Sequence, residues 1–164
     1  MGISATILFK KGHSVEINQL LLHFNQISDS EGWFHNHDLK KYDDMQKLKY
    51  SEFCLSDIPL RDCYERQICF GIADEPYPFK LVYFEWDSPN NEYFKTVVSS
   101  DFDGNEDLLF QVLLAVLIEY PDAKVWIEEN WFYTLDDLKR INDSYHSRWC
   151  YMDPQIFREE NSFG

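Results

Sequence analysis

Residues 108–118 constrain the fold more than any other stretch of the chain. Ten of these eleven residues are apolar, and Gln111 is the exception. A membrane-spanning helix needs about 20 apolar residues, so this run is too short to cross a bilayer. A helix that is apolar on almost every side has to be buried inside a core. We therefore expect a central core helix over 106–120, which Pro121 ends.

Hydrophobic periodicity predicts the strands that surround this helix. Alternation of apolar and polar residues is typical of half-buried strands. It occurs over 3–9, 47–55, 67–73, 79–86, 93–98 and 123–127. Turn residues over 74–78 and 87–91 predict that the three middle strands form an antiparallel meander. The polar residues over 29–44 predict a long loop.

Capping residues predict where two further helices begin. Ser14 precedes apolar residues at helical spacing, so its hydroxyl can cap a helix that ends near Ser28. Thr134 is followed three residues later by Asp137, which is the spacing of a capping box. The last regular helix is therefore expected to begin just after Thr134.

Strands that cluster between helices, rather than alternating with them, indicate an α+β fold. We expect a single domain over 1–164, with an antiparallel sheet of about five to six strands packed against two main helices. Residues from about 147 to 164 show no regular pattern and predict an irregular C-terminal tail. Its aromatic residues, among them Trp149 and Phe157, indicate that part of this tail packs back on the domain.

The order of residues at the N-terminus argues against export. A short apolar run precedes Lys10 and Lys11, whereas a signal peptide has its basic residues first. The four cysteines contain no Cys-x-x-Cys pair. We therefore expect a cytoplasmic protein whose thiols are reduced.

Acidic residues are unevenly distributed along the chain. The net charge of −14 argues against binding to nucleic acid or to an anionic membrane, since both require a basic surface. The first fifty residues are neutral overall, whereas 85–137 hold thirteen acids and two lysines together with many aromatic residues. Acids mixed with aromatics are typical of a surface that docks a basic protein. The same composition also fits an acidic solubilising surface whose aromatics point inward.

Six residues near the end of this stretch are candidates for binding a partner. Strand alternation places Trp126 on the face opposite Val125 and Ile127, where it can be partly exposed. Nearby acids would attract a basic partner, and exposed aromatics would anchor it. The candidate partner-binding residues are Trp126, Glu128, Glu129, Trp131, Asp136 and Asp137.

Two segments carry side chains that could bind a metal. Oxygen-bearing side chains alternate over 101–107, but an EF-hand loop has glycine sixth and glutamate twelfth. Here glycine is fourth and Val112 is twelfth. His35 and His37 stand beside Asp38 at a spacing that belongs to no known zinc motif. We favour a capped helix start at the first segment and a solvated loop at the second, and we expect no metal and no cofactor.

The chain has no signature of a nucleophilic or nucleotide-binding enzyme. It contains no Gly-x-Ser-x-Gly nucleophile elbow, no Gly-x-x-x-x-Gly-Lys-Ser/Thr phosphate loop and no Gly-x-Gly-x-x-Gly fingerprint. We therefore assign no catalytic residue and favour a protein that is not an enzyme.

A resemblance to a known family is found towards the C-terminus. Residues 119–129 read Glu-Tyr-Pro-Asp-Ala-Lys-Val-Trp-Ile-Glu-Glu, and 133–138 read Tyr-Thr-Leu-Asp-Asp-Leu. This pattern resembles the C-terminal helix–strand–helix of small acidic bacterial immunity proteins of polymorphic-toxin systems. The resemblance implies a cytosolic protein that neutralises a toxin, often a basic nuclease, by masking its active site. It carries over no catalytic residue.

Two other functions fit the same sequence. A sheet lined by aromatic side chains could hold an apolar ligand, in a ligand-binding or enzymatic domain whose polar groups are His35, His37 or Glu85. The segment from His35 to Asp38 could instead be the centre of a metal-dependent hydrolase. Our first hypothesis is a non-catalytic protein-binding protein whose partner is a basic protein toxin.

Overall fold

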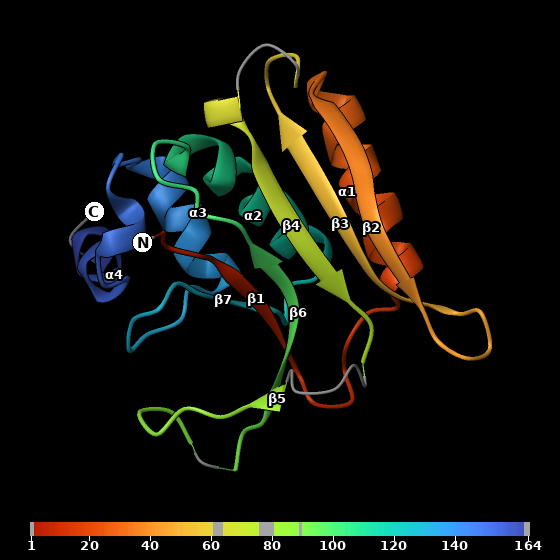
Figure 1. Ribbon diagram of the computed structural model, residues 1–164. Coiled ribbons are helices and arrows are strands. Elements are labelled where there is room, and N and C mark those ends of the chain that lie inside the picture. The colour runs from red at the N-terminus through yellow and green to blue at the C-terminus, as the bar shows by residue number, and fades with distance from the viewer. Residues whose placement is uncertain (1, 61–63, 76–80, 89, 163–164) are drawn as a thin grey trace.

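A seven-stranded sheet with helices packed on one face forms the frame of the molecule (Figure 1). The computed structural model describes residues 2–60, 64–75, 81–88 and 90–162. The strands are β1 (Thr6–Lys10), β2 (Phe34–Tyr42), β3 (Leu48–Ser56), β4 (Ile68–Ala73), β5 (Leu81–Val82), β6 (Tyr93–Ser99) and β7 (Lys124–Trp126). The helices are α1 (Ile17–Glu31), α2 (Glu106–Glu119), α3 (Leu135–Asp143) and α4 (Gln155–Ser162), with short 3-10 helices η1 (Tyr64–Arg66) and η2 (Trp149–Tyr151).

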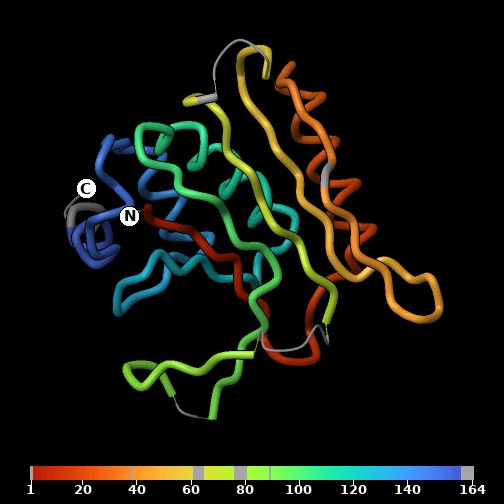
Figure 2. Tube along the Cα trace, in the orientation of Figure 1, coloured from red at the N-terminus to blue at the C-terminus, as the bar shows by residue number. Residues whose placement is uncertain are grey.

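The strand order joins the two halves of the chain in one sheet. The order is β2-β3-β4-β6-β1-β7, and β5 pairs with β6 outside this row. Every strand pairing within the described residues is antiparallel. Figure 2 shows that β1, near the N-terminus, lies between β6 and β7, which come much later in the chain. The predicted α+β class and the antiparallel sheet are confirmed.

α2 is buried, as its apolar sequence predicts. Its buried side chains are Leu108, Leu109, Phe110, Val112, Leu113, Val116 and Leu117. They share one core with α1, whose Phe24 ring lies 5.5 Å from the Phe53 ring of β3 and 5.3 Å from the Phe70 ring of β4. None of the helices described has the length and the apolar character needed to cross a membrane.

The stretch from 29 to 44 is not a loop. It contains the end of α1 and the nine-residue strand β2, which pairs with β3. β2 is at the edge of the sheet, and its side chains are largely exposed. A polar sequence can form a strand here because backbone hydrogen bonds to β3, and not buried side chains, hold it in place. The sheet therefore has seven strands instead of the five to six expected.

The predicted three-stranded meander is wrong. β4 pairs directly with β6, and β5 pairs only with the first residues of β6. Residues 83–86 lie outside the strands, although Val82, Phe84 and Trp86 still share one face as their alternation predicts. Part of the turn predicted over 74–78, and the start of the strand predicted over 79–86, lie outside the described residues.

The start of α1 is stabilised by a distant carboxylate and not by the predicted serine. The backbone N–H of Ile17 donates to Asp74 Oδ1 at 3.4 Å, whereas the Ser14 hydroxyl has no hydrogen-bond partner within the described residues. At α3 the predicted capping box is confirmed. Thr134 Oγ1 accepts from the Asp137 N–H at 3.3 Å, and Asp137 accepts from the Thr134 N–H at 3.0 Å.

The C-terminal segment is ordered and not an irregular tail. It forms η2 and α4, and Trp149 and Phe157 are buried in the main core, as their aromatic character predicts. The Tyr133 hydroxyl lies within hydrogen-bond distance of the carbonyl oxygens of Trp149, at 3.1 Å, and Met152, at 2.8 Å. α4 has only eight residues, so its amphipathic pattern is too short to predict from periodicity.

Cys54 and Cys69 form a disulfide, in contrast to the predicted reduced thiols. The two residues are directly opposite each other in the β3–β4 register, with their Cα atoms 4.0 Å apart. Disulfides are rare in the cytoplasm, so the cysteines do not favour a cytoplasmic location. Cys150 is free, and burial raises the pKa of its thiol to about 12, which makes it a poor nucleophile. Cys63 lies outside the described residues.

We expect the Cys54→Ser/Cys69→Ser double variant to be about 2 kcal/mol less stable than the oxidised protein. This value is at the lower end of the usual range because the cross-link closes a loop of only 15 residues in the unfolded chain. Urea unfolding with and without a reductant measures the effect, since the reductant should destabilise the wild-type protein and leave the variant unchanged. Equal stability of the wild type under both conditions would contradict the cross-link.

Candidate functional site

A second cluster of apolar side chains lies on the sheet face opposite the main core. Leu8 points to this face because it alternates along β1 with Ile7 and Phe9, which belong to the main core. Side chains from β5 and β6, from β7, and from the segments that follow β5 and β7 gather around it. We call this group the aromatic cluster, and its members are Leu8, Val82, Phe84, Trp86, Tyr93, Trp126 and Phe132.

The aromatic cluster is only half-buried. Four of its side chains keep part of their surface in contact with water, and these are Val82, Trp86, Trp126 and Phe132. The Phe84 ring lies 5.0 Å from Trp126 and 5.3 Å from Phe132. The Trp86 ring lies 4.6 Å from Phe132. These contacts hold the rings in place, so their exposed parts form a preformed apolar surface of the kind that marks interaction sites.

Both lysines of the acidic stretch lie against the aromatic cluster. Lys95 Nζ lies 5.3 Å from the centre of the Trp126 ring, and Lys124 Nζ lies 4.9 Å from the centre of the Phe132 ring. A cation over an aromatic face is attracted by the ring quadrupole. Lys124 Nζ also donates to the Tyr93 hydroxyl at 3.3 Å. Both cations are therefore engaged within the molecule.

Three exposed carboxylates flank the aromatic cluster. Glu85 lies between two members of the cluster in the chain, and Glu128 and Glu129 follow Trp126. Within the described residues these three carboxylates make no hydrogen bond or ion pair. The Trp126 indole N–H donates to the Glu129 carbonyl oxygen at 2.8 Å, and Glu128 has a left-handed φ of 58°. The indole therefore closes a tight turn that exposes both glutamates to solvent.

The structure brings together three of the six predicted partner-binding residues. Trp126 is half-buried in the aromatic cluster, and Glu128 and Glu129 are exposed beside it. Trp131 instead packs against the main core, and its buried indole nitrogen has no hydrogen-bond partner within the described residues. Asp136 is exposed in the first turn of α3, and no contact within the described residues joins it to the aromatic cluster.

The sixth candidate, Asp137, is a structural residue and does not lie on the surface. Its side chain is completely buried, and its oxygens accept from Arg158 Nε at 2.7 Å and from Nη2 at 2.8 Å. Burial on its own raises the pKa of this carboxyl, but hydrogen bonds from Arg158 and Thr134 outweigh burial and hold the pKa below its usual range. The ionised carboxylate therefore ties α3 to α4.

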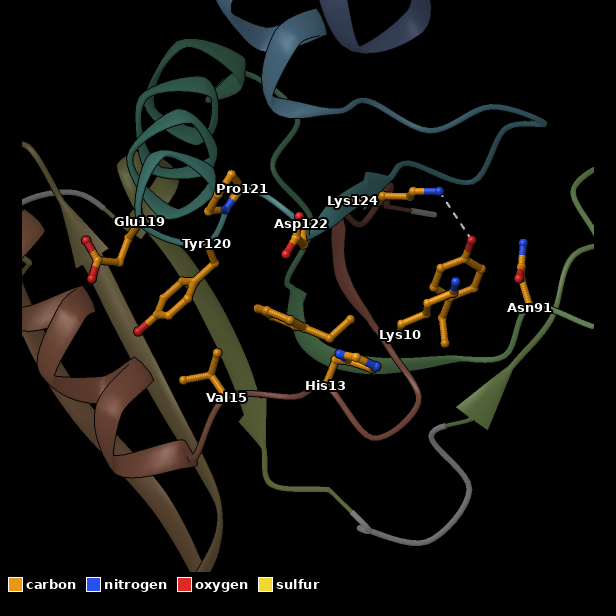
Figure 3. A pocket seen from close by; sticks show the side chains of 11 residues that line it. Lys10, His13, Val15, Asn91, Glu119, Tyr120, Pro121, Asp122 and Lys124 are labelled. Atoms are coloured by element: carbon orange, nitrogen blue, oxygen red, sulfur yellow. Dashed lines mark hydrogen bonds between the residues drawn. The ribbon is translucent and has the colours of Figure 1, made fainter.

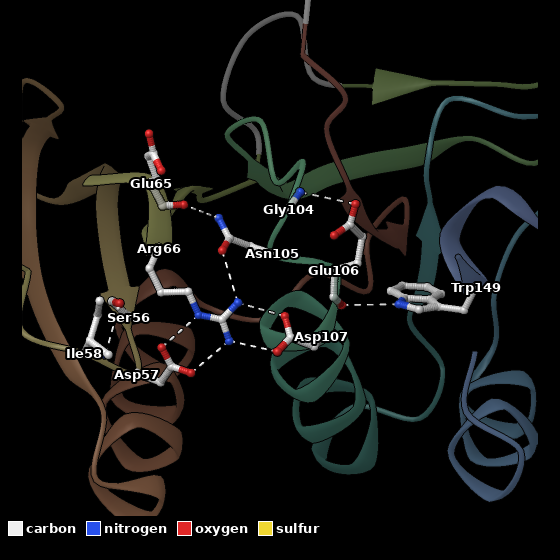
Figure 4. Close-up of polar contacts among 10 residues, drawn as sticks. All are labelled: Ser56, Asp57, Ile58, Glu65, Arg66, Gly104, Asn105, Glu106, Asp107 and Trp149. Atoms are coloured by element: carbon white, nitrogen blue, oxygen red, sulfur yellow. Dashed lines mark hydrogen bonds and ion pairs between the residues drawn. The ribbon is translucent and has the colours of Figure 1, made fainter. Parts of the chain in front are cut away.

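The polar side chains at the start of α2 are engaged in structural contacts (Figure 4). The Arg66 guanidinium donates to the two Asp107 oxygens, each at 2.8 Å, and to the two Asp57 oxygens at 2.9 and 2.8 Å. Hydrogen bonds from Arg66 lower the pKa of both carboxyls. The Asn105 amide donates to the Glu65 carbonyl oxygen at 2.7 Å. These contacts agree with the predicted turn and helix start over 101–107, but the predicted cap is not found, because the Asn105 side chain makes no capping hydrogen bond.

His35 and His37 lie on β2 and not in a solvated loop. The His35 ring stacks on Phe53 at 5.1 Å, and the His37 ring meets Phe53 edge-on at 4.8 Å. Their Nε2 atoms form hydrogen bonds with different residues of α1, namely Asp29 at 3.4 Å and Asn25 at 3.2 Å. Over the ranges that the structure describes, no group of three or more His, Cys, Asp or Glu is placed to hold a metal ion.

A hollow of about 620 Å³ opens at the end of β1 (Figure 3). It lies between the loop that leads to α1 and the loop that joins α2 to β7, and its walls include Phe9 and Tyr120. The polar groups that the sequence predicts for such a pocket do not line it; these are His35, His37 and Glu85. Its lining residues come from separate segments of the chain, so no local pattern reveals it.

No protein-family model, curated protein or solved structure matches this chain. The assignment of function therefore rests on the geometry and charge of the surfaces described above. The likeness of 119–129 and 133–138 to immunity proteins stays a prediction.

Proposed function

We propose that this chain is a non-catalytic protein-binding protein that docks a basic partner on the aromatic cluster. One observation carries the proposal, namely half-buried aromatic rings flanked by three carboxylates that have no partner within the described residues. The resemblance to immunity proteins extends this proposal: the protein would be a cytosolic immunity protein, and its partner would be a basic toxin.

The arrangement of charge and apolar surface suits both the approach of a basic partner and the contact that follows. Exposed carboxylates at Glu85, Glu128 and Glu129 attract a basic protein before contact, because opposite charges accelerate association. On contact, Trp86 and Trp126 lose their remaining exposure to water, and buried aromatic anchors supply much of the binding free energy of protein interfaces. Ring contacts already hold both side chains, so little conformational entropy is lost on binding.

Charge reversal at Glu128 and Glu129 is expected to slow association with the partner. We expect Glu128→Lys/Glu129→Lys to lower the association rate constant by about tenfold and to change the dissociation rate less. The difference from the wild type should shrink as salt is added, because exposed charges are screened. The candidate partner is the product of the adjacent gene, and biolayer interferometry measures both rates.

The matched control is Glu31→Lys/Asp143→Lys. It makes the same change in net charge at two exposed acids at the ends of α1 and α3. This control should slow association much less. Equal slowing by the two double variants would show that net charge governs the encounter, and failure of any adjacent gene product to bind would count against the docking proposal itself.

A further inference from the structure

We infer that the hollow at the end of β1 binds a short zwitterionic peptide of dipeptide size with apolar side chains. Its volume of about 620 Å³ falls within the usual range for small-molecule pockets. The inference is independent of the docking proposal, although two residues line the hollow and also contact the aromatic cluster: Tyr93, which belongs to the cluster, and Lys124, which lies over the Phe132 ring.

The inner wall of the hollow is apolar and preformed. The rings of Phe9 and Tyr120 pack edge to face with their centroids 6.0 Å apart, and Tyr120 also meets the His23 ring of α1 at 5.6 Å. Val15 and Pro121 extend the apolar lining. Because these contacts hold the rings in place, the wall offers a ready surface for an aliphatic or aromatic side chain.

Lysine and histidine side chains lie on one side of the hollow, to the right in Figure 3. Lys10 and His13 line the hollow, and their side chains make no hydrogen bond or ion pair within the described residues. Lys124 Nζ donates one N–H to the Tyr93 hydroxyl at 3.3 Å and has two more to offer. The ammonium groups of Lys10 and Lys124 suit a ligand carboxylate, because hydrogen bonds between charged groups are stronger than those between neutral groups.

Carboxylates line the same hollow nearer to α2 (Figure 3). Glu119 and Asp122 are both exposed, and neither makes a hydrogen bond or ion pair within the described residues. A ligand with only a carboxylate would be repelled by these acids, and a ligand with only an ammonium would be repelled by the lysines. A molecule with a carboxylate at one end and an ammonium at the other can interact with the lysines and with the acids at the same time. A dipeptide with apolar side chains has this form.

The probe is the dipeptide Leu-Phe, titrated into the ¹⁵N-labelled protein and followed by NMR. Its N-acetyl form lacks the ammonium, and its C-terminal amide lacks the carboxylate. We expect Leu-Phe to bind at millimolar concentration or below, with shifts at residues that line the hollow. Each capped form should bind about tenfold more weakly, because a charged hydrogen-bonding group is lost.

Variants test which side chains of the hollow bind each end of the peptide. Lys10→Gln should remove the preference for a free carboxylate, and Glu119→Gln/Asp122→Asn should remove the preference for a free ammonium. Lys11→Gln is the matched control, since this neighbouring exposed lysine does not line the hollow, and it should keep both preferences. The inference is overturned if Leu-Phe does not bind at millimolar concentration or if the capped forms bind equally well. Either result leaves the docking proposal untouched.

Discussion

Replacing Trp149 with alanine is expected to lower the free energy of unfolding by about 3 to 5 kcal/mol. The side chain is completely buried, with its ring 5.2 Å from Phe110 on α2 and 5.5 Å from Tyr133. Its indole N–H donates to the Glu106 carbonyl oxygen at 3.2 Å. The substitution leaves a cavity and removes the indole hydrogen bond to the start of α2, so both packing and a hydrogen bond are lost.

Urea unfolding followed by circular dichroism measures this loss. Trp149→Phe keeps an aromatic ring and loses the indole hydrogen bond, so it should cost about 1 to 2 kcal/mol. Tyr151→Ala is the control, because this neighbouring side chain is 38% exposed, and its cost should stay within about 1 kcal/mol. A similar cost for Trp149→Ala and Tyr151→Ala would show that the C-terminal segment is not part of the core.

Asp137→Ala is expected to lower the free energy of unfolding by about 3 kcal/mol at neutral pH. The substitution removes a completely buried carboxylate together with its hydrogen bonds to Arg158 and Thr134. We place the loss at the lower end of the range for breaking a buried ion pair, because the Arg158 side chain is 42% exposed and can be solvated. Asp136→Ala is the matched control, since this exposed acid stands in the same helical turn and should cost little.

The cost of Asp137→Ala should depend on pH. The pKa of Asp137 is lower in the folded protein than its usual value of 3.8, so the unfolded chain binds the proton more tightly. The stability that Asp137 contributes is therefore complete above that value and is lost as the pH falls through the folded pKa. The difference in stability between the wild type and Asp137→Ala should shrink on acidification below about pH 4. A difference that stays constant down to about pH 2 would contradict the described ion pair.

Elements whose determinants are local could be predicted from the sequence. The apolar run of α2 and the Thr134–Asp137 capping box each depend on a few neighbouring residues, and both are confirmed. β2 could not be predicted, because an edge strand buries few side chains and its hydrogen bonds to β3 leave no periodic pattern. The cap of α1 depends on Asp74, which is 57 residues from Ile17 in the sequence.

The candidate site was predictable only where strand alternation decides the outcome. Alternation along β7 correctly predicts a half-exposed Trp126. The contact of Trp86 with Phe132 depends on tertiary packing, and the aromatic composition of 85–137 is the one signal that points to it. A count of acids could not separate Asp137 from exposed glutamates, because its partner Arg158 is 21 residues away.

The most direct test of the docking surface is the response of the tryptophan indole N–H signals to the basic partner in the ¹⁵N NMR spectrum. The chain has five tryptophans, so single substitutions can assign every indole signal. We predict that the signals of Trp86 and Trp126 shift or broaden on complex formation, while that of the buried Trp149 stays in place. If the partner saturates the protein and the signals of Trp86 and Trp126 do not change, the aromatic cluster is not the docking site.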